Sequence, residues 1–395
     1  MRIVFCLVLL AAVPALGKKQ KELPPEEAVF HNNQGIGFLN QQSMEKAIFE
    51  FQTAIELSPD FAEPYNNLGV LYKIQGEYEK AIAQFQRAIE LNKDYASPYS
   101  HLAAVYLDQG NLDEALKMAK KSVKIGGTSA DTHYNLGMVY TELYKKDPAD
   151  KKYLEQAESE FKRATVLNPK LEPVHLRLAE MYRKAGKYDL AIIRYRLALS
   201  LGNAPAVWEQ LGNLYVEMGD TSKAQNCFQK EAELSPMSDT AFIQLGTTYL
   251  KQKRYEDALG AFQKAIEINP KNEKAHFSLG TLKMEKGLLD EAAENFKKAK
   301  EVNPSFTDAA YNLGVVYLQM GKTDLAEKEW LYAVSVDPNY PRAHYNLALL
   351  SAKQGNWQKA IKRYCQFLKT AGGNFPTEEG LAKKILEEQN AQCPN

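Results

Sequence analysis

The sequence predicts an all-α solenoid of about ten stacked helix pairs, and two repeating patterns lead to this prediction. A small residue, glycine or alanine, returns at a period of 34 residues, and alanine follows most of these markers twelve residues later. This period is typical of helix–turn–helix arrays, in which each pair packs mainly on its neighbours. The markers are Gly35, Gly69, Ala103, Gly137, Ala179, Gly212, Gly246, Gly280, Gly314 and Ala348.

A third small residue stands nineteen residues after most markers, and it completes the packing pattern. Glu231 and Phe367 occupy this position in two of the pairs. Two helices approach closely only where their crossing points carry little side chain, so we expect these positions to lie at helix contacts. The fourth pair has an insertion of eight residues, near positions 143–153, which stretches one spacing to 42 residues. We expect the inserted segment to form a solvated, extended turn.

The elements of each pair follow in a fixed order. Large apolar residues recur at three- and four-residue intervals, as on the buried face of a helix. The first helix of a pair carries tyrosines such as Tyr72, and the second carries phenylalanines such as Phe85. Glycine-containing turns such as Gln75-Gly76-Glu77 join the two helices. Proline, which cannot continue a helix, is expected to end most second helices. These prolines are Pro59, Pro169, Pro236, Pro270, Pro304 and Pro338.

These residues and spacings resemble those of the tetratricopeptide repeat family over residues 28–373. The resemblance implies a right-handed superhelix whose first helices line a concave groove that binds polypeptide. After it, residues 374–395 are expected to form a capping helix and tail. Leu381, Ile385 and Leu386 of that helix are expected to cover the open face of the last pair, because terminal repeats need a cap.

The amino-terminal end is a different kind of segment. Residues 1–17 have one early arginine, a short apolar stretch and small residues before a cleavage point, as in a secretory signal peptide. The apolar stretch is too short for a comfortable membrane span. Residues 18–27 are expected to form a flexible lead-in. We therefore predict an exported protein without a membrane span after cleavage, periplasmic in a Gram-negative source, with an uncleaved anchor as the alternative.

Charge and cysteine usage limit the classes of partner. The chain has 49 lysines and arginines against 49 aspartates and glutamates. This balance argues against nucleic acid as the main partner, since nucleic acid requires a basic field. Cys365 and Cys393 lie in the last helix pair and just beyond the expected cap helix. An oxidising compartment would allow them to form a disulfide that holds the cap, and the alternative is two unlinked thiols.

The sequence contains no recognisable catalytic or metal-binding arrangement. Motifs such as Gly-x-Ser-x-Gly, His-Glu-x-x-His and Cys-x-x-Cys do not occur. Five of the six histidines occupy one equivalent position on the first helix. Neighbouring helices lie about 10 Å apart, so these histidines cannot converge on a zinc ion, and we interpret them as packing residues. We predict a non-enzymatic protein without cofactor or metal.

Binding residues are expected on the first helices, two positions before each marker. This position carries a primary amide in most pairs, which can donate to and accept from an extended peptide backbone. The row is similar to the asparagine ladder in the repeats of O-linked N-acetylglucosamine transferase, although it is interrupted in the middle and that enzyme's catalytic domain is absent. The resemblance implies peptide contact, and the alternative is that the amides solvate the concave wall or bond between neighbouring pairs. The amides are Asn33, Asn67, Asn135, Gln210, Gln244, Asn312 and Asn346.

Two subsites stand out along this row. Tyr311, Arg342 and Tyr345 join Asn312 and Asn346 in a subsite suited to a tyrosine- or proline-containing segment. A basic stretch made of Arg177, Arg183 and Lys184 could take a carboxylate, with a solvated helix end as the alternative.

The predicted function is a protein-interaction scaffold that binds partner polypeptides in the groove. Assembly of an envelope complex or a pilus is one expected role. The alternatives are an accessory subunit that recruits a glycan or cell-wall enzyme, and a self-assembling structural protein in which the lead-in of one copy fills the groove of the next.

Overall fold

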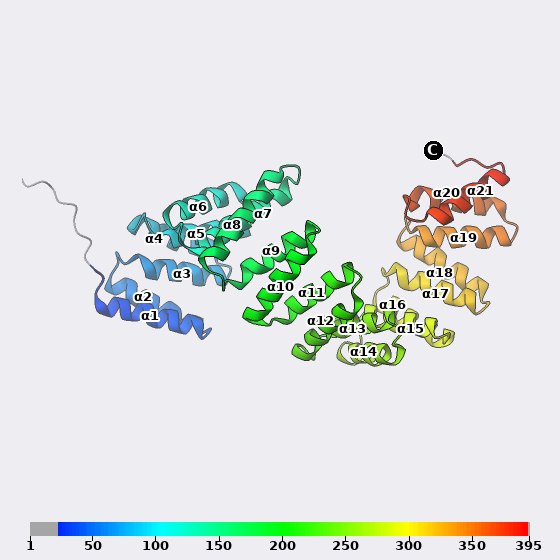
Figure 1. Ribbon diagram of the computed structural model, residues 1–395, viewed down its shortest axis with the longest axis horizontal. Coiled ribbons are helices and arrows are strands. Elements are labelled where there is room, and N and C mark those ends of the chain that lie inside the picture. The colour runs from blue at the N-terminus through cyan, green and yellow to red at the C-terminus, as the bar shows by residue number, and fades with distance from the viewer. Residues whose placement is uncertain (1–22, 394–395) are drawn as a thin grey trace, which may run out of the picture. The chain divides into compact units, whose positions relative to one another are not determined.

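The computed structural model describes residues 23–393, and within that range all regular secondary structure is α-helical (Figure 1). The predicted signal peptide and most of the predicted lead-in lie outside the described residues. The chain forms two compact units, Met1–Met181 and Tyr182–Asn395. We call them the N-terminal and C-terminal units. The boundary between them falls within helix α9.

Ten first helices alternate with ten second helices, as the repeat predicts. The first helices are α1 (Glu26–Asn40), α3 (Ala62–Ile74), α5 (Ala96–Asp108), α7 (Ala130–Lys146), α9 (Glu172–Lys184), α11 (Pro205–Glu217), α13 (Asp239–Lys251), α15 (Glu273–Glu285), α17 (Thr307–Gln319) and α19 (Pro341–Lys353). Because α1 begins at Glu26, the expected flexible lead-in is wrong for its last two residues, which are helical.

Each second helix follows its first helix after a short turn. The second helices are α2 (Met44–Leu57), α4 (Tyr78–Leu91), α6 (Leu112–Ile125), α8 (Lys151–Leu167), α10 (Tyr188–Gly202), α12 (Thr221–Leu234), α14 (Tyr255–Ile268), α16 (Leu289–Val302), α18 (Thr323–Val336) and α20 (Trp357–Ala371). The predicted prolines come two residues after a second helix ends, as Pro270 does after α14. The predicted α-solenoid architecture is confirmed in each unit.

A phenylalanine or tryptophan ring of the second helix packs against the marker glycine of the first. A Cβ atom added to Gly246 would lie 2.6 Å from Cε1 of Phe262, and one added to Gly212 would lie 2.6 Å from Cε1 of Phe228. The equivalent contact at Gly314 is with the indole of Trp330. The marker is therefore small because an aromatic ring occupies the space that its side chain would need.

Where the marker is alanine, the facing residue differs. Ala103 is matched by Ala119 sixteen residues later, and Ala348 is matched by Tyr364. All four side chains are fully buried or nearly so. An alanine marker is thus found opposite either another alanine or a tyrosine.

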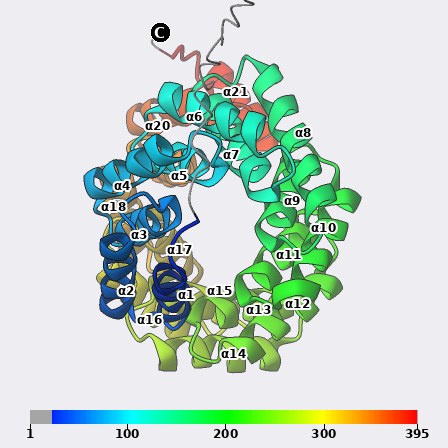
Figure 2. The same cartoon turned by 90° about the vertical axis from the view of Figure 1, so that its left-hand side faces the viewer.

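The first helices of each unit share one side of that unit, which we call the first-helix face. In the N-terminal unit α1 contacts α3, α3 contacts α5, and α5 contacts α7; in the C-terminal unit α13 contacts α15. Figure 2 shows this alternation within each unit, with α3 and α5 on one side and α4 and α6 on the other. Side chains on this face can therefore bond from one pair to the next.

The inserted segment corrects one expectation. It does not form an extended turn along its length, because α7 and α8 each contain 17 residues, whereas most first helices contain 13. Lys145 and Lys146 lie in the added turn of α7, and Lys145 donates to Glu142 at 2.6 Å. The added turn of α8 packs against α7, with the ring of Tyr153 stacked on that of Tyr140 at 6.1 Å. Helix continuation satisfies backbone groups that an extended segment would leave to water.

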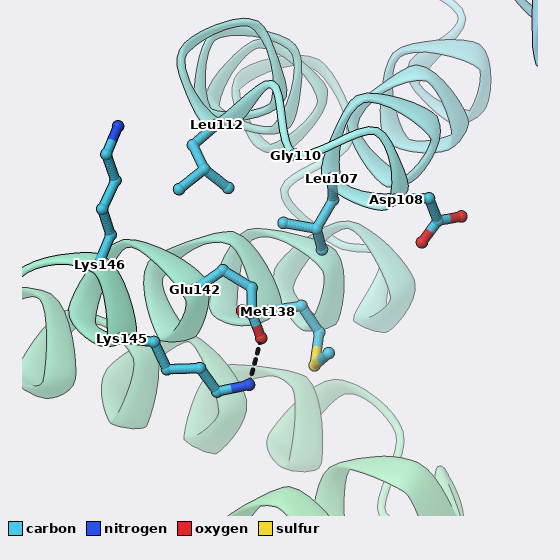
Figure 3. Close-up of a pocket in the computed structure, with 8 residues that line it drawn as sticks. All are labelled: Leu107, Asp108, Gly110, Leu112, Met138, Glu142, Lys145 and Lys146. Carbon is cyan, nitrogen blue, oxygen red and sulfur yellow. Dashed lines mark hydrogen bonds and ion pairs between the residues drawn. The ribbon is translucent and has the colours of Figure 1, made fainter.

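The lengthened α7 also borders a shallow hollow of about 500 Å³ in the N-terminal unit (Figure 3). Leu107, Leu112 and Met138 form its apolar floor. Its rim carries the ion pair between Glu142 and Lys145.

The last helix, α21 (Pro376–Glu388), covers the end of the C-terminal unit as predicted. Leu386 is buried and Ile385 packs beside it, but the expectation for Leu381 is wrong. Leu381 is 49% exposed, and Ala382 takes the buried position instead, because the helix presents residues four apart to the core. In the described residues, no helix is both long enough and apolar enough to cross a membrane.

The tail beyond α21 is tied back to the last helix pair. A disulfide joins Cys365 of α20 to Cys393, with the Cα atoms 5.3 Å apart. Ala391 and Cys393 pack against the same apolar cluster as Phe367. The third cysteine in the described residues, Cys227, is a buried free thiol.

Candidate functional site

The first-helix face carries a repeated hydrogen bond between neighbouring helix pairs. A side chain three positions before one marker bonds to the side chain two positions before the next marker, 35 residues later. The bonded pairs are Asn32 and Asn67 (2.9 Å), Asn66 and His101 (2.9 Å), Ser100 and Asn135 (2.7 Å), Glu209 and Gln244 (3.1 Å), and Tyr311 and Asn346 (3.3 Å).

Four of the seven predicted amides take part in these bonds as donors: Asn67, Asn135, Gln244 and Asn346. Asn312 donates instead to the backbone carbonyl of Asp308 on its own helix, at 2.9 Å. The equivalent acceptor position for Asn312 is Phe277, which offers no hydrogen-bond acceptor. Bonding between neighbours, one of the two interpretations of the row, therefore holds for these four side chains.

The other two amides remain at the surface. Asn33 is exposed and Gln210 is half-buried, and within residues 23–393 neither side chain makes a hydrogen bond to protein. Each bonded amide also keeps a second N–H that these contacts do not use. Contact of the row with a bound peptide stays a prediction.

The last helix pairs form a pocket of about 450 Å³ around four of the five residues of the predicted aromatic subsite. Tyr311, Arg342, Tyr345 and Asn346 line it from α17 and α19, and Asn312 does not. The remaining lining comes from α20 and from the beginning of α21, with Phe367, Asn374, Phe375, Pro376 and Glu378. The cap helix is therefore a wall of the candidate site as well as a cover for the core.

Aromatic rings give the pocket a rigid apolar wall. Tyr345 packs against Phe367 with ring centroids 5.0 Å apart, and Phe367 lies 6.2 Å from Phe375. Tyr311 packs against Tyr340 at 5.5 Å. Such rings offer large contact area at a small cost in conformational entropy, which suits them to binding surfaces.

One cation and one anion stand at this wall. The Arg342 guanidinium lies over the Phe375 ring, 5.7 Å from its centroid. Burial raises the pKa of Tyr345, and the negative charge of Glu378 raises it further. Within the described part of the chain, neither Arg342 nor Glu378 forms an ion pair. The pocket thus presents an unpaired positive group and an unpaired negative group to a ligand.

The basic stretch of the fifth helix pair is already neutralised. Arg177 donates to Glu180 at 3.3 Å. Arg183 makes a two-nitrogen contact with Glu217, and this contact raises the pKa of Arg183 further. These guanidinium groups have carboxylate partners within the chain, so the structure favours the alternative of a satisfied helix end.

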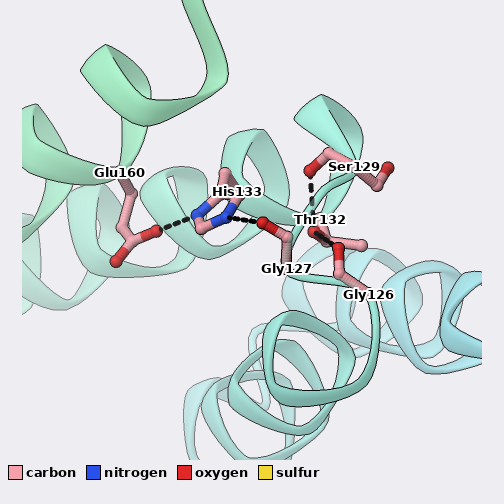
Figure 4. A network of polar contacts seen from close by, with 6 residues as sticks. All are labelled: Gly126, Gly127, Ser129, Thr132, His133 and Glu160. Carbon is pink, nitrogen blue, oxygen red and sulfur yellow. Dashed lines mark hydrogen bonds and ion pairs between the residues drawn. The ribbon is translucent and has the colours of Figure 1, made fainter. Parts of the chain in front are cut away.

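The histidines serve as structural hydrogen-bonding groups. Figure 4 shows His133 between the Glu160 carboxylate, 2.6 Å from Nδ1, and the backbone carbonyl of Gly127, 3.2 Å from Nε2. His175, His276 and His344 each contact the carbonyl of the residue six positions earlier, a proline, through Nε2. They join a first helix to the loop before it, and no cluster of three or more potential metal ligands occurs in residues 23–393.

Two features of the site were not predicted from the sequence. The acceptors three positions before each marker vary from asparagine to serine, glutamate and tyrosine, so they form no recognisable motif. The contribution of Phe375 and Glu378 was missed because they follow the repeats. The paired glycines before them, Gly372 and Gly373, mark a turn that could have indicated a return of the chain toward the last pair.

Comparison with known proteins shows similarity along most of the chain. Sequence profiles of the TPR repeat match residues 71–110 and 280–321, and further tetratricopeptide repeat profiles match residues 50–83, 96–126, 174–206, 205–236, 240–272 and 316–374. Together they cover more than half of the chain. A search of curated protein sequences gives no match.

Solved structures give partial likenesses. A thermophilic TPR protein of Thermus thermophilus is 28% identical, with 48% of this chain and 99% of that chain covered and a TM-score of 0.40. YrrB, described as a TPR protein with an unusual peptide-binding site, is 27% identical over 49% of this chain and 97% of its own, with a TM-score of 0.39. Yeast Tom70 is 16% identical over 92% and 96%, with a TM-score of 0.48.

The repeat period, the coupling of small markers to aromatic rings and the profile matches agree with one another. The fold is that of a protein–protein interaction scaffold and is typically non-catalytic. The chain belongs to the tetratricopeptide repeat family.

Proposed function

We propose that this protein is an exported, non-enzymatic scaffold that holds an extended segment of a partner polypeptide on its first-helix face, with the C-terminal pocket as the principal anchor. The observation that carries the proposal is the composition of that pocket. It combines a wall of aromatic rings with an unpaired cation, an unpaired anion and a primary amide.

The pocket suits a proline or tyrosine side chain of the partner. Such a side chain would pack against the rings of Tyr345 and Phe375, while Arg342 and Glu378 orient polar groups on either side of it. The free N–H of Asn346 would bond a backbone carbonyl of the partner. A wall of rings with a few polar groups is the usual composition of a site that fixes both the position and the direction of a ligand.

Export is supported by the two ends of the chain. Residues 1–17 have the composition of a secretory signal peptide. The disulfide between Cys365 and Cys393 is of a kind that persists in oxidising compartments. Assembly of an envelope complex or a pilus would suit such a scaffold, and recruitment of a glycan or cell-wall enzyme is the alternative. The balanced charge argues against nucleic acid as the partner.

Self-assembly is a second candidate, in which residues 18–27 of one copy occupy the groove of another. Sedimentation of the mature protein at rising concentration, with and without these residues, distinguishes the two. We expect the mature protein to remain monomeric. Concentration-dependent association that requires residues 18–27 would favour self-assembly.

The proposal is tested by partner capture from the envelope fraction of the source cells. Arg342→Glu and Asn346→Ala alter the pocket, whereas Asn312→Ala alters the same repeat position outside it. We expect about tenfold less captured partner with each pocket variant and unchanged capture with Asn312→Ala, since one well-placed contact contributes about 1.4 kcal/mol. Equal capture by all four proteins would exclude the pocket as the anchor. Mass spectrometry of the same mature protein should find Cys365 linked to Cys393 and the chain beginning after Gly17.

A further inference from the structure

Glu231 of α12 breaks the repeat at a buried helix contact. Seven helix pairs have alanine or serine nineteen residues after the marker, the fourth pair has Ala164 at the same place after its insertion, and the sixth pair has Glu231. Its side chain is 4% exposed, and within the described residues its Oε2 atom has no hydrogen-bond partner. A buried carboxyl oxygen without a donor destabilises a fold, and native structures rarely keep one without a function. The other pairs avoid this cost with alanine, serine or, in the tenth pair, phenylalanine.

Two further acceptors of the C-terminal unit belong to the same cluster. Glu209 of α11 accepts a hydrogen bond from Nε2 of Gln244 of α13, at 3.1 Å. The Oε1 atom of Gln244 is itself buried and has no donor among the described residues. Glu209 and Gln244 are half-buried on the first-helix face, and the charge of Glu209 acts on Glu231. The cluster thus has more acceptors than donors.

The charged groups on the surrounding helices do not neutralise the acceptors of this cluster. α12 packs against α11 and α13. On α11, the charged group that acts on Glu231 is Glu209. The other acid of that helix, Glu217, pairs with Arg183. On α13 the nearby polar group is the neutral Gln244, and Asp239 accepts from Asn269 and Asn272.

On α12 itself the remaining groups are also occupied or neutral. Lys230 pairs with Glu233 at 2.6 Å, and burial raises the pKa of the Cys227 thiol to about 11, which keeps it uncharged. Burial and then the Glu209 charge raise the pKa of Glu231 to about 7. A buried carboxyl group beside another negative charge does not ionise easily, so Glu231 retains a proton in part of the molecules near neutral pH.

We propose that Glu209, Glu231 and Gln244 form a subsite for a basic side chain, the ammonium or guanidinium group of a lysine or arginine in the bound polypeptide. The cation contacts the Glu209 carboxylate at the first-helix face, and the buried Gln244 oxygen and Glu231 supply further negative charge from behind. This inference rests on the proposed function, in that the same face receives a polypeptide. An organic cation fits better than a metal ion, because the described residues offer no group of three or more metal-binding side chains.

Occupation of the subsite is coupled to loss of a proton from Glu231. A cation beside the two carboxyl groups favours the ionised form of Glu231, so the proton held in the free protein passes to the buffer. Affinity for a basic side chain therefore rises as the pH rises through the pKa of Glu231. Between pH 6 and pH 8 we expect an increase of roughly tenfold, because the ionised fraction changes by about that factor.

The test uses two probe peptides, acetyl-Ala-Ala-Lys-Ala-Ala-amide and the same peptide with glutamine in place of lysine. Titration calorimetry with the full mature protein at pH 6 and pH 8, in two buffers of different ionisation enthalpy, gives both the affinity and the protons released. We expect roughly tenfold tighter binding of the lysine peptide at pH 8, release of up to one proton, and at least tenfold weaker binding of the glutamine peptide.

Two variants identify the residues responsible. Glu231→Ala restores the residue found in most other pairs, so it should fold, and we expect it to remove the pH dependence and the proton release. Glu209→Gln should reduce the affinity for the lysine peptide by at least tenfold. Equal affinity for the two peptides, pH-independent binding of the lysine peptide, or an unchanged titration of Glu231→Ala would each overturn the subsite. Partner capture that depends on Arg342 would still support the C-terminal anchor, so the two proposals can fail separately.

Discussion

Helices α12 and α14 of the C-terminal unit are built on the same repeat and differ at one buried position. Each carries a phenylalanine against a marker glycine, Phe228 against Gly212 and Phe262 against Gly246, with the same close approach. Three residues later α14 has Ala265, fully buried, and α12 has Glu231. The aromatic crossing is thus closely similar in the two helices. The next buried side chain is apolar in α14, whereas in α12 it is a carboxyl group that no cation neutralises among the described residues.

The difference shows which buried position of a helix pair can change its residue type without loss of the fold. The aromatic crossing holds the two helices of a pair together, and a change there would disturb the packing itself. At the contact three residues later, Glu231 is acted on by the charge of Glu209 on the first helix of the same pair, so a polar residue placed there alters the first-helix face without altering the aromatic crossing. The aromatic–glycine crossing should therefore tolerate no change, whereas the position three residues later should tolerate a change of residue type.

The largest effect is expected at the crossing itself. Phe228→Ala and Phe262→Ala each empty the space against a glycine, so each should destabilise its pair by about 3–5 kcal/mol. Hydrogen exchange of peptides from α11–α12 and α13–α14 measures the loss locally, which suits an array whose pairs need not unfold together. A loss confined to one of the two variants would show that the crossings are not equivalent.

Introducing an acid at the equivalent position of α14 is expected to lower the free energy of unfolding by slightly less. Ala265→Glu places a carboxyl group in a packed contact that has no counterpart of the Glu209 and Gln244 cluster, and we expect a loss of about 2–4 kcal/mol. The exposed Gln263→Glu on the same helix is the control and should change stability by less than about 0.5 kcal/mol. If Ala265→Glu were neutral, the site around Glu231 would need no special accommodation.

Removing the acid should stabilise the protein in a pH-dependent way. The folded-state pKa of Glu231, about 7, lies above the ordinary value of 4.5, so the folded state binds the proton more tightly than the unfolded state. Wild-type stability from this group is therefore full below about pH 4.5 and is lost as the pH rises to 7.

Relative to wild type, Glu231→Ala should accordingly gain about 2 kcal/mol between pH 5 and pH 8. Urea unfolding at the two pH values measures this gain. Glu233→Ala serves as the control, since the ion pair with Lys230 lowers the pKa of Glu233 and no such gain is expected. An equal response of the two variants would contradict a buried, protonated Glu231.

The smallest effect is expected at a glycine outside the crossing. Gly260 of α14 has no atom within 4 Å of an added Cβ, so Gly260→Ala should stabilise the helix by about 0.5–1 kcal/mol. The same change at Gly246 would push a Cβ into the Phe262 ring and should destabilise by about 1–3 kcal/mol. Thermal unfolding of both variants measures the two changes in stability. A change of the same sign in both would refute the steric role of the marker glycine.

The sequence predicted the helix pairs well and the candidate site in part. The period located every pair because it records contacts between adjacent segments, which each pair must satisfy in the same way. It also indicated Tyr311, Arg342 and Tyr345, since aromatic, amide and basic groups combine in the last two pairs. It missed the extra helical turns of α7 and α8, because Pro148 and the aspartates around it favour a turn and the spacing alone does not show how far the flanking helices extend.

The sequence by itself determined the fold, the number of helix pairs and the row of amides, because local periodicity and small crossing residues are properties of the chain. Only the tertiary structure decided what those amides bond to, because each acceptor lies on the preceding first helix and differs in chemical type from pair to pair. It likewise decided that Arg342 lies over Phe375, that Glu378 lines the same pocket, and that the Oε2 atom of Glu231 has no donor among the described residues. Those contacts depend on which surfaces the packed helices bring together, and no repeat of residue types encodes them.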